Sequence, residues 1–220
     1  MKERPVIFNG EMVRAILDGR KTQTRRVIAV QPESNQFGLL RIADSTKHSD
    51  IGKYHWAESN ATGTHQRSAL FSCPFGQVGD RLWVRETFAA FDADWKHPGK
   101  PHDLRDGPWP NVVYPASVAK IPDGTCRPSI HMPRWASRIT LEITAVRVER
   151  LNDISHDDAK AEGCCYARGG GVPDFAVTPA DHFPTLWASI YGEESWSANP
   201  WVWVIEFRRV CDGAREVERG

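Results

Sequence analysis

The sequence has no excess of charge of either sign, no long apolar run and no even set of cysteines. Its 220 residues include 28 lysines and arginines and 28 aspartates and glutamates, so the formal net charge is zero. General nucleic-acid binders are usually basic, so this balance argues against one, although it leaves room for a local basic patch. No stretch approaches the ~20 apolar residues of a membrane span, and residues 1–5 lack the apolar run of a signal peptide. We therefore expect no contact with a membrane.

The cysteines do not form the pattern of a disulfide framework. There are five, at Cys73, Cys126, Cys164, Cys165 and Cys211, and two of them are adjacent. An odd number with an adjacent pair is typical of reduced thiols, so we expect a cytoplasmic protein. Their spacing from the histidines matches no zinc motif, and we expect neither a metal nor any other cofactor.

The apolar periodicity predicts an α+β domain. Asn9 and Ser155 are suited to cap the first and second helices, and Gly19 and Gly163 are suited to end them. The expected strands span 6–8, 27–30, 81–88, 138–151 and 200–207, and the expected helices span 11–18, 155–163 and 181–191. Their order, β-α-β-β-β-α-α-β, favours a small, mixed and mostly antiparallel barrel with helices over its openings. The tryptophans at 187, 196, 201 and 203 are expected to pack in its core.

Two long segments are expected to be loop insertions in a single domain that spans 1–211. Segment 31–78 is polar and irregular, with room for a small hairpin, and segment 89–133 holds eight of the 15 prolines. Such a density of proline predicts little regular structure. The triple glycine at 169–171 lacks the preceding strand and following lysine of a phosphate loop, so we expect a mobile loop there. The charged tail 212–220 is expected to fray.

The most informative stretch is 19–26, which reads GRKTQTRR. It follows the first predicted helix, so Lys21 and Thr24 are expected in a turn or first strand, close enough to meet. Three interpretations remain open at this point. The segment is a phosphate-binding patch, a lysine-activated hydroxyl nucleophile, or a solvated basic turn that favours the helix dipole.

Three short motifs, in this order, resemble those of the ASCH domain, which belongs to the PUA-like superfamily of pseudo-barrels. They are 19–26, the turn 79–82 (GDRL) and 158–163 (DAKAEG). The closing strand 203–207 (WVIEF) is also similar to that family's last strand. The whole chain resembles the long phage and prophage proteins of this type, through 4–8 (RPVIF) and 127–137.

This resemblance implies an enzyme. Some small bacterial ASCH members are amidohydrolases that remove the acyl group from N4-acetylcytidine and related N4-acylated cytosines, and they use a lysine, a threonine and a glutamate. Those positions match Lys21, Thr24 and Glu162. The family was first proposed to bind RNA, and some members are similar to ribonucleases, so an RNA-binding module and a nuclease are the alternatives. We expect a monomer whose partner is a modified cytidine or cytosine.

The chemistry explains why these residue types are needed. The Thr24 hydroxyl is a weak nucleophile until a base takes its proton, and Lys21 is such a base only when neutral, which requires burial or nearby positive charge. Glu162 would orient Lys21, shuttle a proton to the leaving amine, or activate water. Arg26 is the expected side-chain contact to the substrate. Trp83, on the less regular face of its strand, is the expected stacking partner of the cytosine ring.

Overall fold

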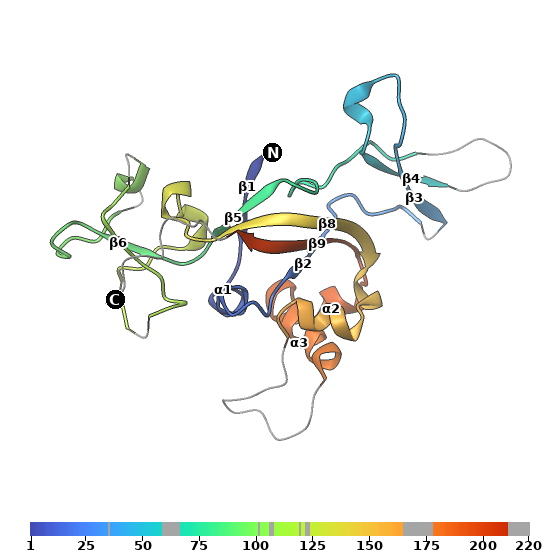
Figure 1. Cartoon of the computed structure of the whole chain (residues 1–220). Helices are drawn as coiled ribbons and strands as arrows, with labels where there is room; N and C mark the ends of the chain where they lie inside the picture. The colour runs from blue at the N-terminus through green and yellow to red at the C-terminus, as the bar shows by residue number, and fades with distance from the viewer. Residues whose placement is uncertain are drawn as a thin grey trace.

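The longest alternating apolar run of the sequence forms the centre of a five-stranded sheet. In the computed structural model, strand β8 (Thr140–Arg150) pairs antiparallel with β9 (Trp201–Val210), with an irregularity between Ile143 and Ala145. β9 also pairs antiparallel with β2 (Gln23–Val27), and β8 with β5 (Arg81–Arg85). Strand β1 (Glu3–Ile7) runs parallel to β5. The order across the sheet is therefore β1-β5-β8-β9-β2 (Figure 1). The structure describes residues 1–34, 36–58, 67–100, 102–105, 108–118, 120–121, 124–164 and 178–210.

Without the two insertions, the elements follow the predicted order. The helices are α1 (Gly10–Leu17), α2 (His156–Ala161), α3 (Pro179–Tyr191) and the short α4 (Glu194–Ser197). The α+β class with mainly antiparallel pairing is thus confirmed. A closed barrel was also expected, but among the described residues no strand-to-strand hydrogen bonds close the sheet. Its edges β1 and β2 are instead linked by a side chain, since Arg26 Nη2 donates to the Ile7 carbonyl at 2.9 Å.

The helix caps predicted from the sequence are present. The Asn9 carboxamide accepts from the backbone N–H of Met12 at 2.9 Å, and Ser155 accepts from that of Asp158 at 3.1 Å. Gly19 and Gly163 take φ angles of 74° and 92° just past α1 and α2, in the left-handed region that favours glycine. These two glycines bring the ends of the two helices together at the edge of the sheet.

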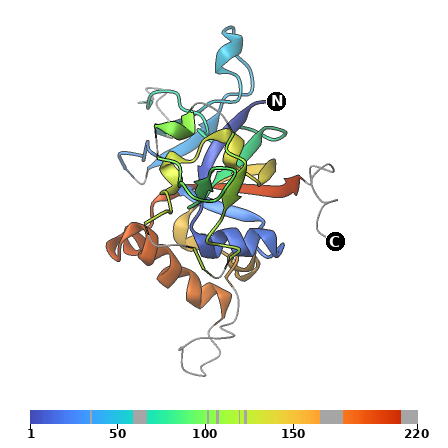
Figure 2. The ribbon, with the colours of Figure 1, turned by 90° about the vertical axis from the view of Figure 1, so that its left-hand side faces the viewer.

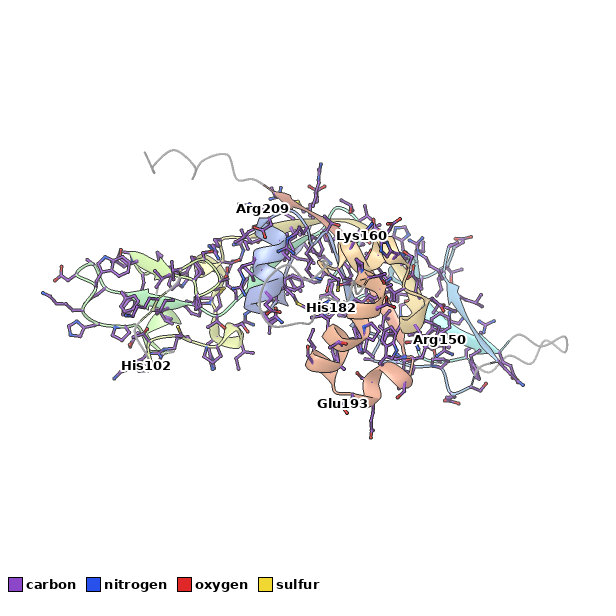
Figure 3. The ribbon with its side chains drawn as sticks, turned by 90° about the horizontal axis from the view of Figure 1, so that it is seen from below. His102, Arg150, Lys160, His182, Glu193 and Arg209 are labelled. Atoms are coloured by element: carbon purple, nitrogen blue, oxygen red, sulfur yellow. The ribbon has the colours of Figure 1, made fainter. Side chains whose placement is uncertain are left out.

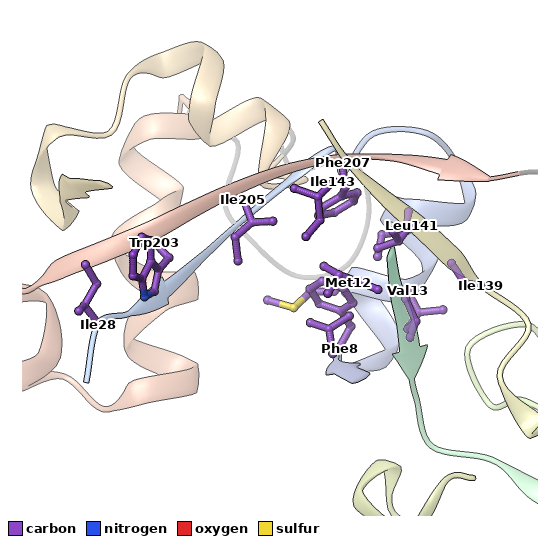
Figure 4. Close-up of a cluster of buried hydrophobic side chains, with 14 residues drawn as sticks. Phe8, Met12, Val13, Ile28, Ile139, Leu141, Ile143, Trp203, Ile205 and Phe207 are labelled. Carbon is purple, nitrogen blue, oxygen red and sulfur yellow. The ribbon is translucent and has the colours of Figure 1, made fainter. Parts of the chain in front are cut away.

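The core explains why the first half of β9, residues 201–205, is apolar without interruption. Its side chains alternate between two clusters: Trp203, Ile205 and Phe207 pack against α1 and the sheet, whereas Val202 and Val204 pack against α2 and α3. Figure 4 shows the first cluster. A strand buried on both faces has no reason to alternate with polar residues. In Figures 1 and 2, α1 and α3 lie below the sheet, and Figure 3 views this underside.

The first strand after α1 differs from the prediction. A strand was expected at 27–30, but β2 begins at Gln23, so Thr24 lies in the first strand after the helix, one of the two places expected for it. A solvated basic turn was one of the three interpretations of this segment. The reason for the difference is that Lys21 and Arg25 are buried together with carboxylates, which allows a polar segment to enter the sheet.

The first insertion contains the hairpin for which the sequence left room, β3 (Phe37–Arg41) with β4 (Tyr54–Glu58), and a 3₁₀ turn at His48–Asp50. Aromatic side chains attach it to the sheet. Trp56 is fully buried against Trp201, with 5.2 Å between the rings, and Tyr54 meets Trp203 edge-on at 5.1 Å.

The second insertion has little regular structure, as its prolines predict, but it does have short elements. It holds the strand pair β6 (Ala89–Phe91) with β7 (Asn111–Val113) and 3₁₀ turns at Asp103–Arg105 and Ser129–His131, and a further 3₁₀ turn at Arg134–Ala136 follows it. A small core that includes Phe88, Leu104 and Met132 packs there. The prolines lie outside the strands. Pro128 and Pro133 cap 3₁₀ turns. The two insertions extend from opposite ends of the sheet (Figure 1).

Candidate functional site

The ends of α1 and α2 meet in a buried ion pair between Lys21 and Glu162. The Lys21 ammonium donates to Glu162 Oε2 at 2.7 Å and to the Glu162 carbonyl at 2.9 Å. Close approach of the two segments depends on Gly163, because a Cβ there would lie 3.1 Å from that of Ala15 and 3.2 Å from that of Lys21. Residues 141 positions apart are thus held in direct contact.

Burial changes the acid–base properties of this lysine. Lys21 is 2% exposed and Glu162 is 4% exposed. Burial lowers the pKa of Lys21; the Glu162 carboxylate opposes this, the charge of Arg26 adds to it, and the net pKa is lowered. A buried ammonium is easier to deprotonate because the charged form has lost its water shell. Lys21 is therefore closer to the neutral form that a general base needs than an exposed lysine is.

Arg25 holds the other oxygen of the same carboxylate. Its Nη1 lies 3.5 Å from Glu162 Oε1, and its Nη2 lies 3.0 Å from Glu149 and 3.4 Å from Asp158. The guanidinium is fully buried, and three carboxylates around one buried cation offset its loss of hydration. Glu162 is thereby fixed between two cations, Lys21 and Arg25, and its orientation is set from both sides.

Thr24 is completely buried in β2, opposite Ile205 of β9. Its hydroxyl has no hydrogen-bond partner among the described residues. An unpaired buried hydroxyl costs about 1–3 kcal/mol, so such groups are rare in native proteins. The contact expected between the lysine and the threonine is not formed here, because Lys21 donates to Glu162 and not to Thr24.

Arg26 lies at the rim of the same site. It packs over the Phe8 ring at 5.3 Å, as Lys21 does at 5.6 Å, and its Nη groups donate to the carbonyls of Ile7 and Arg25. It also lines the cleft described below, next to Glu162. The expected substrate contact is therefore positioned where a ligand of this cleft would meet it.

Trp83 lies elsewhere. Its neighbours Leu82 and Val84 point into the core, which leaves Trp83 on the opposite face of β5, between the guanidinium groups of Arg85 at 5.4 Å and Arg134 at 6.0 Å. It is not among the residues that line the cleft. The contacts of the described residues do not bring Trp83 to the other candidate residues.

A cleft runs along the buried pair, between β2 and α3. Arg25, Arg26 and Glu162 form its polar side, and α3 provides an apolar wall that includes Phe183, Trp187 and Tyr191. It encloses about 240 Å³ with its open mouth included, but a water-sized molecule has only about 10 Å³ of free space within it. That is room for one water, so a larger ligand requires the walls to separate.

Sequence reasoning assigned Trp187 to the core and missed this wall. The assignment is correct for burial, since Trp187 is 3% exposed and packs beside Phe183. The three aromatic residues at 183, 187 and 191 nevertheless recur every four positions, which places them on one face of a helix. That stripe was the signal that could have identified the wall.

The basic segment exposes few free cations. Arg20 pairs with Asp18 at 2.8 Å, Lys21 and Arg25 are buried against carboxylates, and Arg26 binds backbone carbonyls. A larger and more open hollow beside it encloses about 600 Å³ with its open mouth included. It is lined by Thr22, Gln23, Thr144, Asp157, Asp158, Ala161, Glu206 and Phe207. Its charged groups are all carboxylates, which repel phosphate.

Other features predicted from the sequence can be placed more briefly. Cys73, Cys126 and Cys164 form no disulfide among the described residues, whereas the two remaining cysteines, the triple glycine and the charged tail lie outside them. Within the described ranges, no three His, Cys, Asp or Glu side chains are grouped to hold a metal ion. None of the described helices has the length and apolar character needed to cross a membrane.

No known protein family, curated protein or solved structure matches the chain.

Proposed function

We propose that the chain is a metal-independent amidohydrolase that removes the acyl group from N4-acylated cytosine nucleosides or bases. The observation that carries this proposal is the fully buried Lys21–Glu162 pair, whose Glu162 lines a cleft, together with the buried and unpaired hydroxyl of Thr24, three positions along the chain from Lys21. The ASCH resemblance of these three positions supports the same reaction. We further propose that the open sheet is a PUA-like pseudo-barrel, in which the Arg26–Ile7 contact links the two edge strands.

In the first step, neutral Lys21 accepts the proton of the Thr24 hydroxyl while the Thr24 oxygen attacks the acyl carbon. The lowered pKa of Lys21 supports this role, because a base must be deprotonated to act. Lys21 shares its proton along a 2.7 Å hydrogen bond to Glu162, which gives the carboxylate a direct part in the transfer. A rotation of the lysine or threonine side chain must first bring the two groups into contact.

The tetrahedral intermediate carries a negative oxygen, and Arg26 is the cation at the rim of the cleft best suited to stabilise it. The intermediate collapses when the bond from carbon to N4 breaks, and the proton held by Lys21 or Glu162 moves to N4. The cytosine leaves with its free exocyclic amine, and Thr24 carries the acyl group as an ester. Water then attacks the ester and the pair accepts its proton. As the bond from the acyl carbon to the Thr24 oxygen breaks, that proton returns to the Thr24 oxygen, and the carboxylic acid departs.

The nucleic-acid alternative is less well supported by the contacts. A phosphate-binding patch requires cations that are free to meet solvent-borne phosphate, but Lys21 and Arg25 are 2% and 1% exposed and paired with carboxylates. The larger hollow nearby is acidic. These contacts favour proton transfer over phosphate binding as the role of the segment.

The deciding experiment follows the ultraviolet spectrum of N4-acetylcytidine as it is converted to cytidine by the purified protein. Thr24→Val removes the hydroxyl and keeps the shape, and we expect turnover to fall by about 10³-fold or more. Thr22→Val is the matched control, because Thr22 is exposed and two positions away; it should retain activity. Absence of turnover by the wild-type chain on acetyl and longer N4-acyl substrates would refute the proposal, and a salt-dependent shift of RNA would favour the alternative.

A further inference from the structure

Two buried N–H donors without a partner lie on the walls of the same cleft. Within the part of the chain that the structure describes, neither Arg25 Nε nor Trp187 Nε1 has a hydrogen-bond partner. Both residues line the cleft, and they are 1% and 3% exposed. Each such group costs about 1–3 kcal/mol when left unpaired. Two of them on facing elements, β2 and α3, indicate that the cleft is built for an acceptor that a ligand brings.

Neighbouring contacts fix both donors in place. The two Nη groups of Arg25 are bound to carboxylates, and because the guanidinium is planar this also fixes its Nε–H. The Trp187 ring stacks on Tyr191 with 4.3 Å between the centroids and packs beside Phe183 at 6.0 Å. Fixed, buried donors select a ligand with a matching acceptor, since any other ligand leaves them unpaired.

We infer that this cleft is the subsite for the pyrimidine ring, in which Arg25 and Trp187 donate to ring acceptors and the aromatic wall of α3 contacts the ring. The inference rests on the proposed function and names the residues that would confer its specificity. A cytosine ring is planar and carries a carbonyl oxygen and a ring nitrogen as acceptors. Glu162 lines the same cleft and forms one end of the lysine pair, so a ring bound here would present its N4 substituent to the reacting groups.

The ring can enter only if the cleft widens. The free space inside is about 10 Å³, which is far too small for a base. Tyr191 covers the face of Trp187 and is 37% exposed. Its side chain can therefore turn into solvent without disturbing the buried side chains of the core. Movement of Tyr191 would widen the cleft, and the ligand ring would then lie at the edge of the indole, where the Nε1–H can donate to a ring acceptor in its own plane.

Isothermal titration with cytidine tests this subsite without any need for turnover. Trp187→Phe keeps an aromatic ring and removes the N–H, and we expect the dissociation constant for cytidine to rise about tenfold. Trp196→Phe is the matched control: Trp196 packs on Phe183 in the same cluster but does not line the cleft, so its substitution should leave binding within about twofold. Thermal unfolding of each variant shows whether the fold is retained.

The outcomes separate the subsite from the reaction. Binding of cytidine that is weakened by Trp187→Phe alone supports the subsite, even if N4-acetylcytidine is never hydrolysed, in which case the proposed reaction fails. Hydrolysis with equal cytidine binding by the wild type and Trp187→Phe overturns the subsite and leaves the reaction intact. A wild-type chain that binds no cytosine nucleoside overturns the subsite as well.

Discussion

Two regions of the molecule combine arginine with tryptophan, and they differ in whether their donors are paired. On the outer face of β5, Trp83 lies between Arg85 and Arg134. Arg85 donates to the carbonyls of Met132 and Ile130, and Arg134 donates to Glu3. The two guanidinium groups beside Trp83 are thus engaged within the protein, and the cluster has the character of a structural contact, although Nε of Arg81 on the same strand also has no partner among the described residues.

The cleft beside α3 has the opposite character. Arg25 and Trp187 are more deeply buried than the residues of the β5 face, and each retains an N–H without a described partner. Thr24, on the same strand as Arg25, retains a free hydroxyl. A buried polar group without a hydrogen-bond partner lowers the stability of the fold and is tolerated where function requires it. The comparison therefore directs attention to the cleft and away from Trp83.

The largest expected effect comes from removing one arginine from each region. Arg25→Met leaves Glu149, Asp158 and Glu162 without their buried cation, so we expect the free energy of unfolding to fall by about 3–5 kcal/mol. Arg134→Met breaks a surface ion pair with Glu3 and removes the guanidinium from the Trp83 ring, and should cost about 1 kcal/mol. Urea unfolding of both variants measures the difference. Equal losses would remove the distinction between the regions.

The second test concerns the pH dependence of turnover. Turnover requires neutral Lys21, so its rate should rise with pH through the Lys21 pKa, which burial lowers and Glu162 raises. Glu162→Gln removes the opposing carboxylate, and the rising limb of kcat should move to lower pH as the residual rate falls. A pH–rate profile of both proteins measures the shift. An unmoved limb would mean that the titrating group is not Lys21.

The sequence predicted the secondary-structure elements and their ends better than the contacts between them. The caps at Asn9 and Ser155 and the stops at Gly19 and Gly163 are local signals, and all four were correct. The order of the central elements also followed from local periodicity. The sheet order, by contrast, joins β1 to β5 across more than 70 residues, and no local pattern encodes that pairing.

The candidate site was predictable only in part. Nothing in the sequence separates a buried from a solvated lysine, because burial of Lys21 depends on Glu162, which lies 141 positions away. The resemblance supplied that pairing where periodicity could not. Trp83 and Trp187 show the limit of periodicity in another way. The pattern of a strand or helix tells which face a tryptophan occupies, but its role depends on which hydrogen bonds its surroundings offer.

A smaller effect distinguishes the two tryptophans in turnover. Trp83→Ala truncates a ring that does not line the cleft, so we expect kcat/KM for N4-acetylcytidine to stay within about twofold once the folded fraction is equal. The original sequence-based expectation, that Trp83 stacks on the cytosine ring, predicts instead a rise in KM of about tenfold or more. Steady-state kinetics at a temperature well below unfolding decides between them.

The smallest effect concerns acid stability next to the cleft. Burial alone would raise the pKa of Asp158, but the hydrogen bond from Ser155 and the charges of Arg25 and Arg147 together lower it. A carboxylate whose folded pKa lies below its unfolded value of 3.8 stabilises the fold above that pH, and its contribution is lost as pH falls through the folded pKa. The free energy of unfolding should therefore decline below about pH 4. Asp158→Asn should flatten that decline, because the group no longer titrates. The same slope in both proteins would mean that the network around Arg25 does not hold Asp158 in its charged form.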